Sequence, residues 1–283
     1  MKKTPKSLKP LLEDGIIDKV IRPIMSGKEA KVYLVEVNDE YRCAKVYKDV
    51  HQRSFQNSSI YREGRKERNS RKARAMAKRS NYGRKEEENS WQNAEVHALN
   101  RLADAGVRVP ITYGCFDGVL LMDLVSDEHG NIAPRLSEVE MNAEIAAEFH
   151  QILLTELVRM LCAGLVHGDL SEYNILVDEH GPVIIDLPQA VDASANNNAK
   201  MIFERDVNNL RLFFGAHVPE ILETQYGPEI WEIYESGELR PETILSGKFT
   251  ADEKLANVDE VLEEIEVARE EAEAARLYAA SRA

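Results

Sequence analysis

The order of hydrophobic and polar positions changes character along this chain. Up to about residue 125, short runs rich in β-branched and aromatic side chains are separated by turn residues, a pattern typical of β-strands. Asn38-Asp39 is the clearest turn signal between two such runs. We therefore expect five strands, at Ile16–Met25, Lys31–Val37, Tyr41–Tyr47, Thr112–Cys115 and Val119–Leu124.

Apolar residues first recur at helical spacing in Ser90–Leu102, and Gly106 ends this segment. After residue 126 most of the chain has helical spacing. A capping-box pattern at Ser137–Glu140 predicts a helical region that runs to about Cys162. Further helices are expected at Lys200–Phe214 and around Trp231, with a short helix or irregular arm at Lys6–Asp14. The pattern predicts an arm at 1–15, a β-rich part at 16–125 and a mainly helical part at 126–250.

Two segments carry strongly unbalanced charge, which the net charge of −13 conceals. Residues 48–89 have few apolar side chains, and within them Arg62–Lys85 holds eleven Lys and Arg against two Glu, a balance of +9. This basic block predicts either contacts with the phosphates of RNA or a ribosomal particle, or a solvated loop that orders over a nucleotide. Residues 251–283 hold ten acidic against four basic residues, and helical spacing at Val258–Ala279 predicts an acidic helical tail.

Length and composition exclude several classes of protein. A chain of 283 residues is long enough for one bilobal domain or two small ones. No apolar run approaches the roughly 18 residues of a membrane span, and the N-terminus lacks the apolar core of a signal peptide. Three cysteines without a Cys-x-x-Cys pair argue against a disulfide framework and a zinc site. We expect a cytoplasmic protein with no membrane partner.

Three polar residues in the second half form the main chemical signal. Asp169 follows an apolar approach and His167-Gly168, Asn174 comes five residues later, and Asp186 follows the apolar run Val183–Ile185. Phosphoryl transfer requires a carboxylate for the acceptor's proton, together with an amide and a second carboxylate that hold magnesium against phosphates. Asp169 is therefore the candidate catalytic residue, whereas His167 is expected to hold the loop.

A second candidate group lies in the β-rich part. Lys45 is placed on one strand face because its neighbours Ala44 and Val46 share the opposite face. Glu95 is the only acidic residue between Trp91 and Leu102, and it could pair with Lys45. Ser26–Ala30 joins two strands and could place backbone amides and a hydroxyl around phosphates, although its single glycine makes it neither a Walker loop nor a Gly-x-Gly-x-x-Gly loop.

Together these motifs resemble the RIO family of atypical serine/threonine protein kinases. The resemblance extends from about Ile17 to Gly215 and rests on Ser26–Tyr33, Ala44–Tyr47, Trp91–Glu95, His167–Asn174 and Ile184–Asp186. It implies an α+β, bilobal, protein-kinase-like fold with a small β-rich N-lobe, a mainly helical C-lobe and no activation segment. The chain reads Asp186-Leu187-Pro188 rather than Asp-Phe-Gly and has no Ala-Pro-Glu. The basic insert is similar to the family's flexible loop.

The resemblance also implies roles for individual residues. Lys45 would bind ATP phosphates with Glu95 as its partner, and the nucleotide loop would include Ser26, Gly27, Lys28 and Val32. Met122 would lie at the back of the adenine pocket, with Asp123, Leu124 and Val125 as the hinge. Asn174 and Asp186 would hold Mg²⁺ or Mn²⁺. Asp186 would in addition be a transient phosphate acceptor, which suggests an ATPase cycle.

Three functions remain open at this point. The first is a RIO-type kinase or ATPase that acts on protein serine or threonine, or on itself. The second is a small-molecule phosphotransferase of the aminoglycoside or choline kinase kind, which shares the His-Gly-Asp and later Ile-Asp motifs. Against it stand Ser26–Tyr33, Ser171–Tyr173, the basic insert, and a helical segment before Leu165 that looks too short for a substrate pocket. The third is a nucleotide-gated protein that binds RNA or a ribosomal particle.

Overall fold

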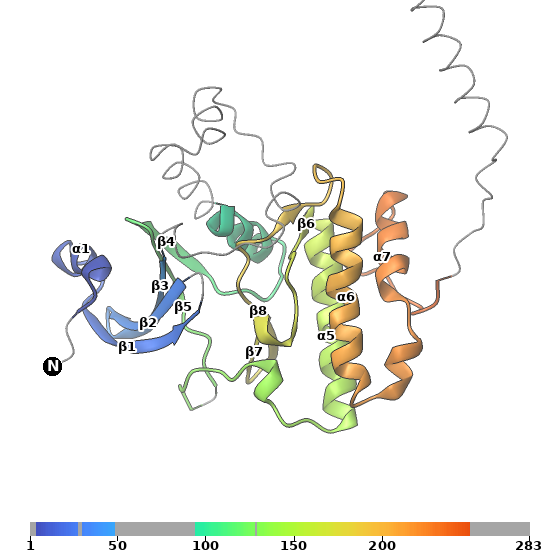
Figure 1. Cartoon of the computed structure of the whole chain (residues 1–283), viewed down its shortest axis with the longest axis horizontal. Coiled ribbons are helices and arrows are strands. Elements are labelled where there is room, and N and C mark those ends of the chain that lie inside the picture. The colour runs from blue at the N-terminus through green and yellow to red at the C-terminus, as the bar shows by residue number, and fades with distance from the viewer. Residues whose placement is uncertain (1–3, 28–29, 49–93, 128, 250–283) are drawn as a thin grey trace, which may run out of the picture. The chain divides into compact units, whose positions relative to one another are not determined.

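The computed structural model describes residues 4–27, 30–48, 94–127 and 129–249 (Figure 1). Lys28, nearly all of the predicted insert at 48–89 and the predicted tail at 251–283 lie outside these ranges. The chain divides into two compact units, Met1–Lys248 and Phe249–Ala283. All elements named below belong to the first unit.

The five predicted strands form one antiparallel sheet with the order β1-β2-β3-β5-β4. Their bounds are β1 Lys19–Ser26, β2 Ala30–Val37, β3 Glu40–Tyr47, β4 Thr112–Phe116 and β5 Val119–Asp123. The predicted turn between β2 and β3 is present, and both Asn38 and Asp39 have positive φ (51° and 64°). Asparagine and aspartate tolerate this backbone region better than other side chains, which explains the tight connection.

Alternation along the strands gives this sheet two faces with different partners. Cys43 and Lys45 lie on one face of β3, and Ala44 lies on the other. The Ala44 face belongs to a small hydrophobic cluster that also contains Val35, Val119 and Leu121. The opposite face is therefore left for the pocket described below.

The N-terminal segment completes the cluster on the Ala44 face. It forms a 3-10 turn, Lys6–Leu8, and a short helix α1, Lys9–Glu13. Leu8 and Leu11 are 0% and 1% exposed, and Ile17 joins them in the same cluster. The segment predicted as a short helix or irregular arm is thus packed as part of the hydrophobic core of this sheet.

A larger core includes the helix at residues 94–104 and the three long helices that follow (Figure 1). These are α5 Ala143–Cys162, α6 Ala199–Gly215 and α7 Tyr226–Glu235, and α5 packs against both of the others. The start predicted for the first of them was wrong. Leu136–Glu138 forms a separate 3-10 turn, and α5 begins only after Asn142, whose side-chain oxygen accepts a hydrogen bond from the backbone N–H of Ile145 at 2.9 Å.

Short strands between the helices carry the second chemical motif. β7 (Ile175–Asp178) and β8 (Gly181–Ile184) form a tight antiparallel hairpin, whose second strand includes part of the apolar run before Asp186. β6 (Leu165–Val166) pairs with β9 (Val191–Asp192), a pairing too short to leave a pattern in the sequence. None of the helices in the described ranges is both long enough and apolar enough to cross a membrane.

Candidate functional site

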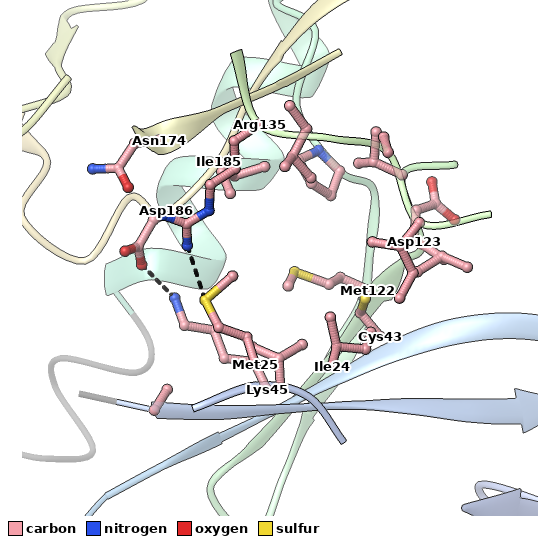
Figure 2. Close-up of a pocket in the computed structure, with 18 of the residues that line it drawn as sticks. Ile24, Met25, Cys43, Lys45, Met122, Asp123, Arg135, Asn174, Ile185 and Asp186 are labelled. Atoms are coloured by element: carbon pink, nitrogen blue, oxygen red, sulfur yellow. Dashed lines mark hydrogen bonds and ion pairs between the residues drawn. The ribbon is translucent and has the colours of Figure 1, made fainter. Parts of the chain in front are cut away.

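A pocket of about 510 Å³ lies between the Lys45 face of the sheet and the β7–β8 hairpin (Figure 2). Its size is within the usual range for small-molecule sites, about 300–1,000 Å³. Most of the residues predicted to bind a nucleotide line it: Gly27, Val32, Lys45, Met122, Asp123, Leu124, Val125, Asn174 and Asp186. Ser26, Glu95 and Asp169 are not among the lining residues, and Lys28 lies outside the described ranges.

The register of the strands explains which side chains the sheet contributes to the wall of the pocket. Val32 in β2 pairs with Lys45 in β3, and Cys43 pairs with Met122 in β5. Directly paired residues on adjacent strands project to the same face of a sheet. These four side chains, far apart in sequence, therefore meet at the wall of the pocket that the sheet forms. The segment from Asp123 to Val125 continues from β5 along the edge of the pocket.

Lys45 connects the two walls through two carboxylates. Its Nζ lies 2.6 Å from Glu95 Oε1, on the helix at 94–104, and 2.7 Å from Asp186 Oδ1. Figure 2 shows Lys45 and Asp186 pointing toward one another across the pocket. Burial alone would lower the pKa of the ammonium, but the negative charges of Asp186 and Glu95 outweigh it and raise the pKa. The predicted ion pair between Lys45 and Glu95 is present, and Lys45 is charged.

The other oxygen of Glu95 is held by Tyr47. The phenol O–H of Tyr47 donates a hydrogen bond to Oε2 of Glu95. Burial, followed by the nearby Glu95 charge, raises the pKa of this phenol, which keeps it protonated and able to donate. Glu95 is only 1% exposed, so both of its oxygens need partners within the protein. Tyr47 is a member of the site to which the sequence analysis gave no role.

Asp186 occupies an unusual backbone conformation. Its φ is +67°, in the left-handed region that side chains other than glycine rarely adopt. Such conformations cost of order 1–3 kcal/mol and are concentrated at functional sites. The ammonium of Lys45 lowers the pKa of Asp186 and outweighs the effect of burial. The carboxylate is therefore ionised and aimed at the pocket.

The β7–β8 hairpin brings Asn174 and Asp186, which are separated in the sequence, close together in space. Its register pairs Ile175 with Ile184, and the backbone N–H of Ile185 donates to the carbonyl of Asn174 at 3.0 Å. Asn174 is thereby placed opposite the residue that precedes Asp186. In Figure 2 the amide of Asn174 lies on the same side of the pocket as the Asp186 carboxylate. Its Nδ2 donates to the backbone carbonyl of Asp169 at 2.8 Å, which links the hairpin to the preceding loop.

The loop that carries Asp169 is fixed from within by His167. The Nε2 of His167 lies 3.0 Å from the carbonyl oxygen of Ile185, and its Nδ1 accepts the backbone N–H of Asp169 at 3.2 Å. Burial lowers the pKa of this imidazole to about 4, so it is neutral near pH 7. With both nitrogens occupied, His167 acts as a structural brace, as expected. Asp169 itself is exposed, and partial desolvation by the surrounding loop raises its pKa.

A buried carboxylate on α6 holds the same loop from below. Asp206 is 0% exposed and accepts the backbone N–H groups of Gly168 at 2.8 Å and Leu170 at 3.3 Å. Arg205 donates to the carbonyl of Gly168, and Asn209 donates to the carbonyl of Leu170 at 2.9 Å. Burial raises the pKa of Asp206 to about 7 against the opposing influence of Arg205. The sequence analysis missed these three residues, although an aspartate within the apolar stripe of a helix was an available signal.

The donor atoms at this site fit a nucleotide bound with a hard divalent cation. Asn174 and Asp186 offer oxygen ligands, and in the described ranges no three His, Cys, Asp or Glu side chains converge on a point. Magnesium is usually held by one or two carboxylates plus substrate phosphates rather than by a cage made only of protein. A pair of oxygen donors beside a cationic lysine has this chemistry.

Further lining residues were not identified from the sequence. Some are apolar and need only shape, as Ile24, Ile132, Ala133 and Leu176 do. Two are charged, Arg135 and Glu138, and they precede and end the 3-10 turn Leu136–Glu138. Glu138 lies within the capping-box pattern at Ser137–Glu140, but that pattern predicted a helix start and no place in a pocket.

Comparison with known proteins agrees with this geometry. A family model described as the RIO domain matches residues 31–226. The RIO-type serine/threonine-protein kinase Rio1 of Haloferax volcanii is 34% identical over 207 residues, which cover 72% of this chain and 66% of that protein. The protein of the same name from Methanocaldococcus jannaschii is 31% identical over 215 residues, covering 75% of this chain and 69% of that protein.

A eukaryotic relative is longer. The serine/threonine-protein kinase rio1 of Schizosaccharomyces pombe is 27% identical over 212 residues, which cover 72% of this chain but only 40% of that protein. The chain thus spans less than two thirds of the length of several of the curated relatives it matches. The matched segment contains Lys45, Glu95, Asp169, Asn174 and Asp186. This chain belongs to the RIO family.

Proposed function

We propose that this protein is an ATP-dependent phosphotransferase of RIO type. It transfers the γ-phosphate of ATP to a protein serine or threonine or to itself, and Asp186 is the residue that would take up phosphate in an ATPase cycle. The observation that carries this proposal is the position of Lys45, which bridges Glu95 at 2.6 Å and Asp186 at 2.7 Å at the wall of a pocket of about 510 Å³. A cation held at such a place by two carboxylates is suited to bind phosphate.

Each residue has a role that follows from its surroundings. Lys45 binds phosphate oxygens, and Glu95 and Tyr47 fix its position from the buried side. Met122 to Val125 provide the edge against which the base lies. Bound Mg²⁺ or Mn²⁺, held by Asn174 and Asp186, would neutralise charge that develops on the phosphates.

Asp169 is the group that holds the proton of the acceptor hydroxyl. It lies on the loop fixed by His167 and Asp206, and Asn174 donates to its backbone carbonyl. Its side chain is exposed, so a hydroxyl on a large partner can reach it. Partial burial raises its pKa, which makes it a better proton acceptor than an ordinary aspartate.

The test is ATP turnover by the full chain with Mg²⁺ or Mn²⁺, followed by mapping of protein-bound phosphate. Asp169→Ala should slow transfer by about 10²-fold or more while ATP still binds, since general-base effects have this size. Asp186→Ala should abolish turnover. Asp104→Ala, an exposed aspartate outside the site, is the matched control. Turnover at the wild-type rate in both site variants would refute the proposal.

The fate of the phosphate separates the remaining alternatives. Phosphate on serine or threonine resists hydroxylamine, whereas an aspartyl phosphate on Asp186 is cleaved by it. Transfer to added aminoglycoside or choline, with no labelled protein, would instead indicate the small-molecule phosphotransferase. Binding of ATP without ADP formation under any of these conditions would indicate a nucleotide-gated binding protein.

A further inference from the structure

Arg135 crosses the pocket from the side of the β7–β8 hairpin to the side of the sheet. Its backbone pairs with Leu176 of β7, and its Nη2 lies 2.9 Å from the sulfur of Met25 in β1. These two residues are 110 positions apart in the chain. Figure 2 shows the guanidinium next to Met25, on the side of the pocket where Asp186 lies. Arg135 is therefore a second cation in the pocket. Lys45 comes from the sheet, whereas the backbone of Arg135 lies on the opposite side, beside β7.

The backbone of Arg135 is fixed, whereas its side chain has only a weak partner. The backbone N–H donates to Glu138 Oε2 at 3.0 Å, and the neighbouring carbonyl of Pro134 accepts the N–H of Val177 at 2.9 Å. A guanidinium has five N–H donors, and a thioether is a weak acceptor. Within the part of the chain that the structure describes, Arg135 forms no ion pair.

The positive charge of Arg135 also acts at the end of the pocket where phosphates would lie. Its guanidinium lies beside Met25, on the side of the pocket that carries the Asp186 carboxylate (Figure 2). Arginine binds phosphate through two parallel N–H donors, and such charge-assisted bonds are about twice as strong as neutral ones. Exchanging a thioether for a phosphate oxygen would therefore be favourable.

Building on the proposed function, we propose that Arg135 is a phosphate-binding residue of this pocket. In the structure its guanidinium donates to the sulfur of Met25. When a nucleoside diphosphate or triphosphate binds, the guanidinium leaves the thioether and donates to a phosphate oxygen. Arg135 thus favours phosphorylated nucleotides over the bare nucleoside, in addition to the contribution of Lys45.

The competing explanation is that Arg135 is only a structural link, called a strap here, between the β7 side of the pocket and β1. The two roles differ in their dependence on Met25. A strap fails equally when either end is removed, and it affects every ligand of the pocket. A phosphate ligand fails only when the guanidinium is lost, and it affects only ligands that carry phosphate.

The experiment measures the affinities of ATP and adenosine by calorimetry, with Mg²⁺ present, and compares their ratio between variants. Arg135→Met should weaken ATP binding at least about 10-fold and adenosine binding less than about threefold, as expected for charge-assisted hydrogen bonds. Arg135→Lys, which keeps one charge without the planar fork, should lie between. Arg22→Met removes an exposed arginine of β1 outside the pocket lining and is the matched control for charge. Met25→Leu should leave the ratio as it is, even if both affinities change together.

Either of two results would overturn the role of Arg135. One is an Arg135→Met variant, folded as judged by its thermal transition, in which the ratio of the two affinities equals that of the wild type. The other is a Met25→Leu variant that lowers the ratio as much as Arg135→Met does. A wild-type protein that does not bind ATP at all would refute the proposed function itself, and the phosphate role of Arg135 with it.

Discussion

Lys45 and Asp186 form a 2.7 Å ion pair although 141 residues separate them in the chain. One residue belongs to the middle of the sheet and the other follows the β7–β8 hairpin. The contact lies on the face of the sheet that also packs against the main hydrophobic core, which includes Leu120, the strand partner of Lys45. It also brings together the proposed phosphate-binding cation and the proposed metal-binding carboxylate.

The first prediction concerns the buried half of this network. The side chains of Lys45 and Glu95 are 9% and 2% exposed. Lys45→Met should lower the free energy of unfolding by about 3–5 kcal/mol, because it leaves Glu95 as a buried charge without its cation. The double variant Lys45→Met, Glu95→Gln should recover part of this loss. Urea unfolding of the wild type, the two single variants Lys45→Met and Glu95→Gln, and the double variant measures the coupling energy between the two residues.

The same series has an exposed control. Lys19→Met removes the cation of a 3.7 Å pair with Glu36 in which the lysine side chain is 66% exposed. It should cost less than about 1 kcal/mol, as surface pairs usually do. If the effects of Lys45→Met and Glu95→Gln simply add, the two residues are not energetically coupled and this interpretation fails.

The second prediction concerns the phenol of Tyr47. Tyr47→Phe keeps the ring and deletes the hydroxyl that donates to the buried Glu95 carboxylate. We expect a loss of about 1.5–3 kcal/mol in unfolding free energy, the usual size for a hydrogen bond to a charged group. Tyr41→Phe, at a position that is 53% exposed, is the matched control and should change stability little. Equal stability of the two variants in urea would show that Glu95 does not depend on Tyr47.

The third prediction uses the titration of Asp206. Burial raises its pKa from 3.8 to about 7, so between these values the folded protein holds a proton that the unfolded chain has released. This contribution to stability is fully present below about pH 4 and is lost as the pH rises to about 7. The unfolding free energy of the wild type minus that of Asp206→Asn should therefore fall over this range.

Chemical denaturation at pH 4.5, 5.5, 6.5 and 7.5 measures that difference, since asparagine does not titrate. A difference that stays constant, or that rises with pH, would show that the pKa of Asp206 is not raised. Asp192→Asn is the constant control over this range. Partial burial opposes the shift, but hydrogen bonds from Ser194 and Ala195 lower the pKa of Asp192 from 3.8, so its contribution to stability is lost only as the pH falls below about 4.

The fourth prediction concerns the basic block Arg62–Lys85, which lies outside the described residues. If the block binds RNA, affinity should fall steeply as salt rises, because phosphate contacts release counterions. Replacing Arg71, Lys72 and Arg74 by glutamine should lower the slope of log affinity against log salt by about 2, at roughly 0.7 per contact to a single strand. Filter binding at 50–300 mM salt measures both slopes. Identical slopes would favour the solvated loop.

The sequence predicted the strands well because their signal is local. Alternation, a turn at Asn38-Asp39 and short apolar runs are all decided by neighbouring residues. The start of α5 was predicted too early for a related reason. Ser137–Glu140 has the letters of a capping box, but Leu136–Glu138 closes as a 3-10 turn and Asn142 supplies the cap that the helix uses.

The parts of the site that the sequence missed depend on contacts between distant residues. Asp206 faces Gly168 from a helix 38 residues later, and Arg135 reaches Met25 across 110 residues. No periodicity within one segment can encode either contact. By contrast, the closeness of Asn174 and Asp186 follows from a hairpin register, which a spacing of residues does carry.

The packing of the N-terminal helix bears on which segment of this protein folds as one unit. The family likeness begins at residue 31 and ends at residue 226. Leu8 and Leu11 are nevertheless sealed beneath the sheet, and Trp231 and Leu239 lie in the main core beyond the other limit. A fragment cut to the shared segment would lose Met25 and Gly27 from the pocket and expose both hydrophobic clusters to water. The segment shared with the family is therefore shorter than the segment that has to fold as one unit, which extends beyond it at both ends.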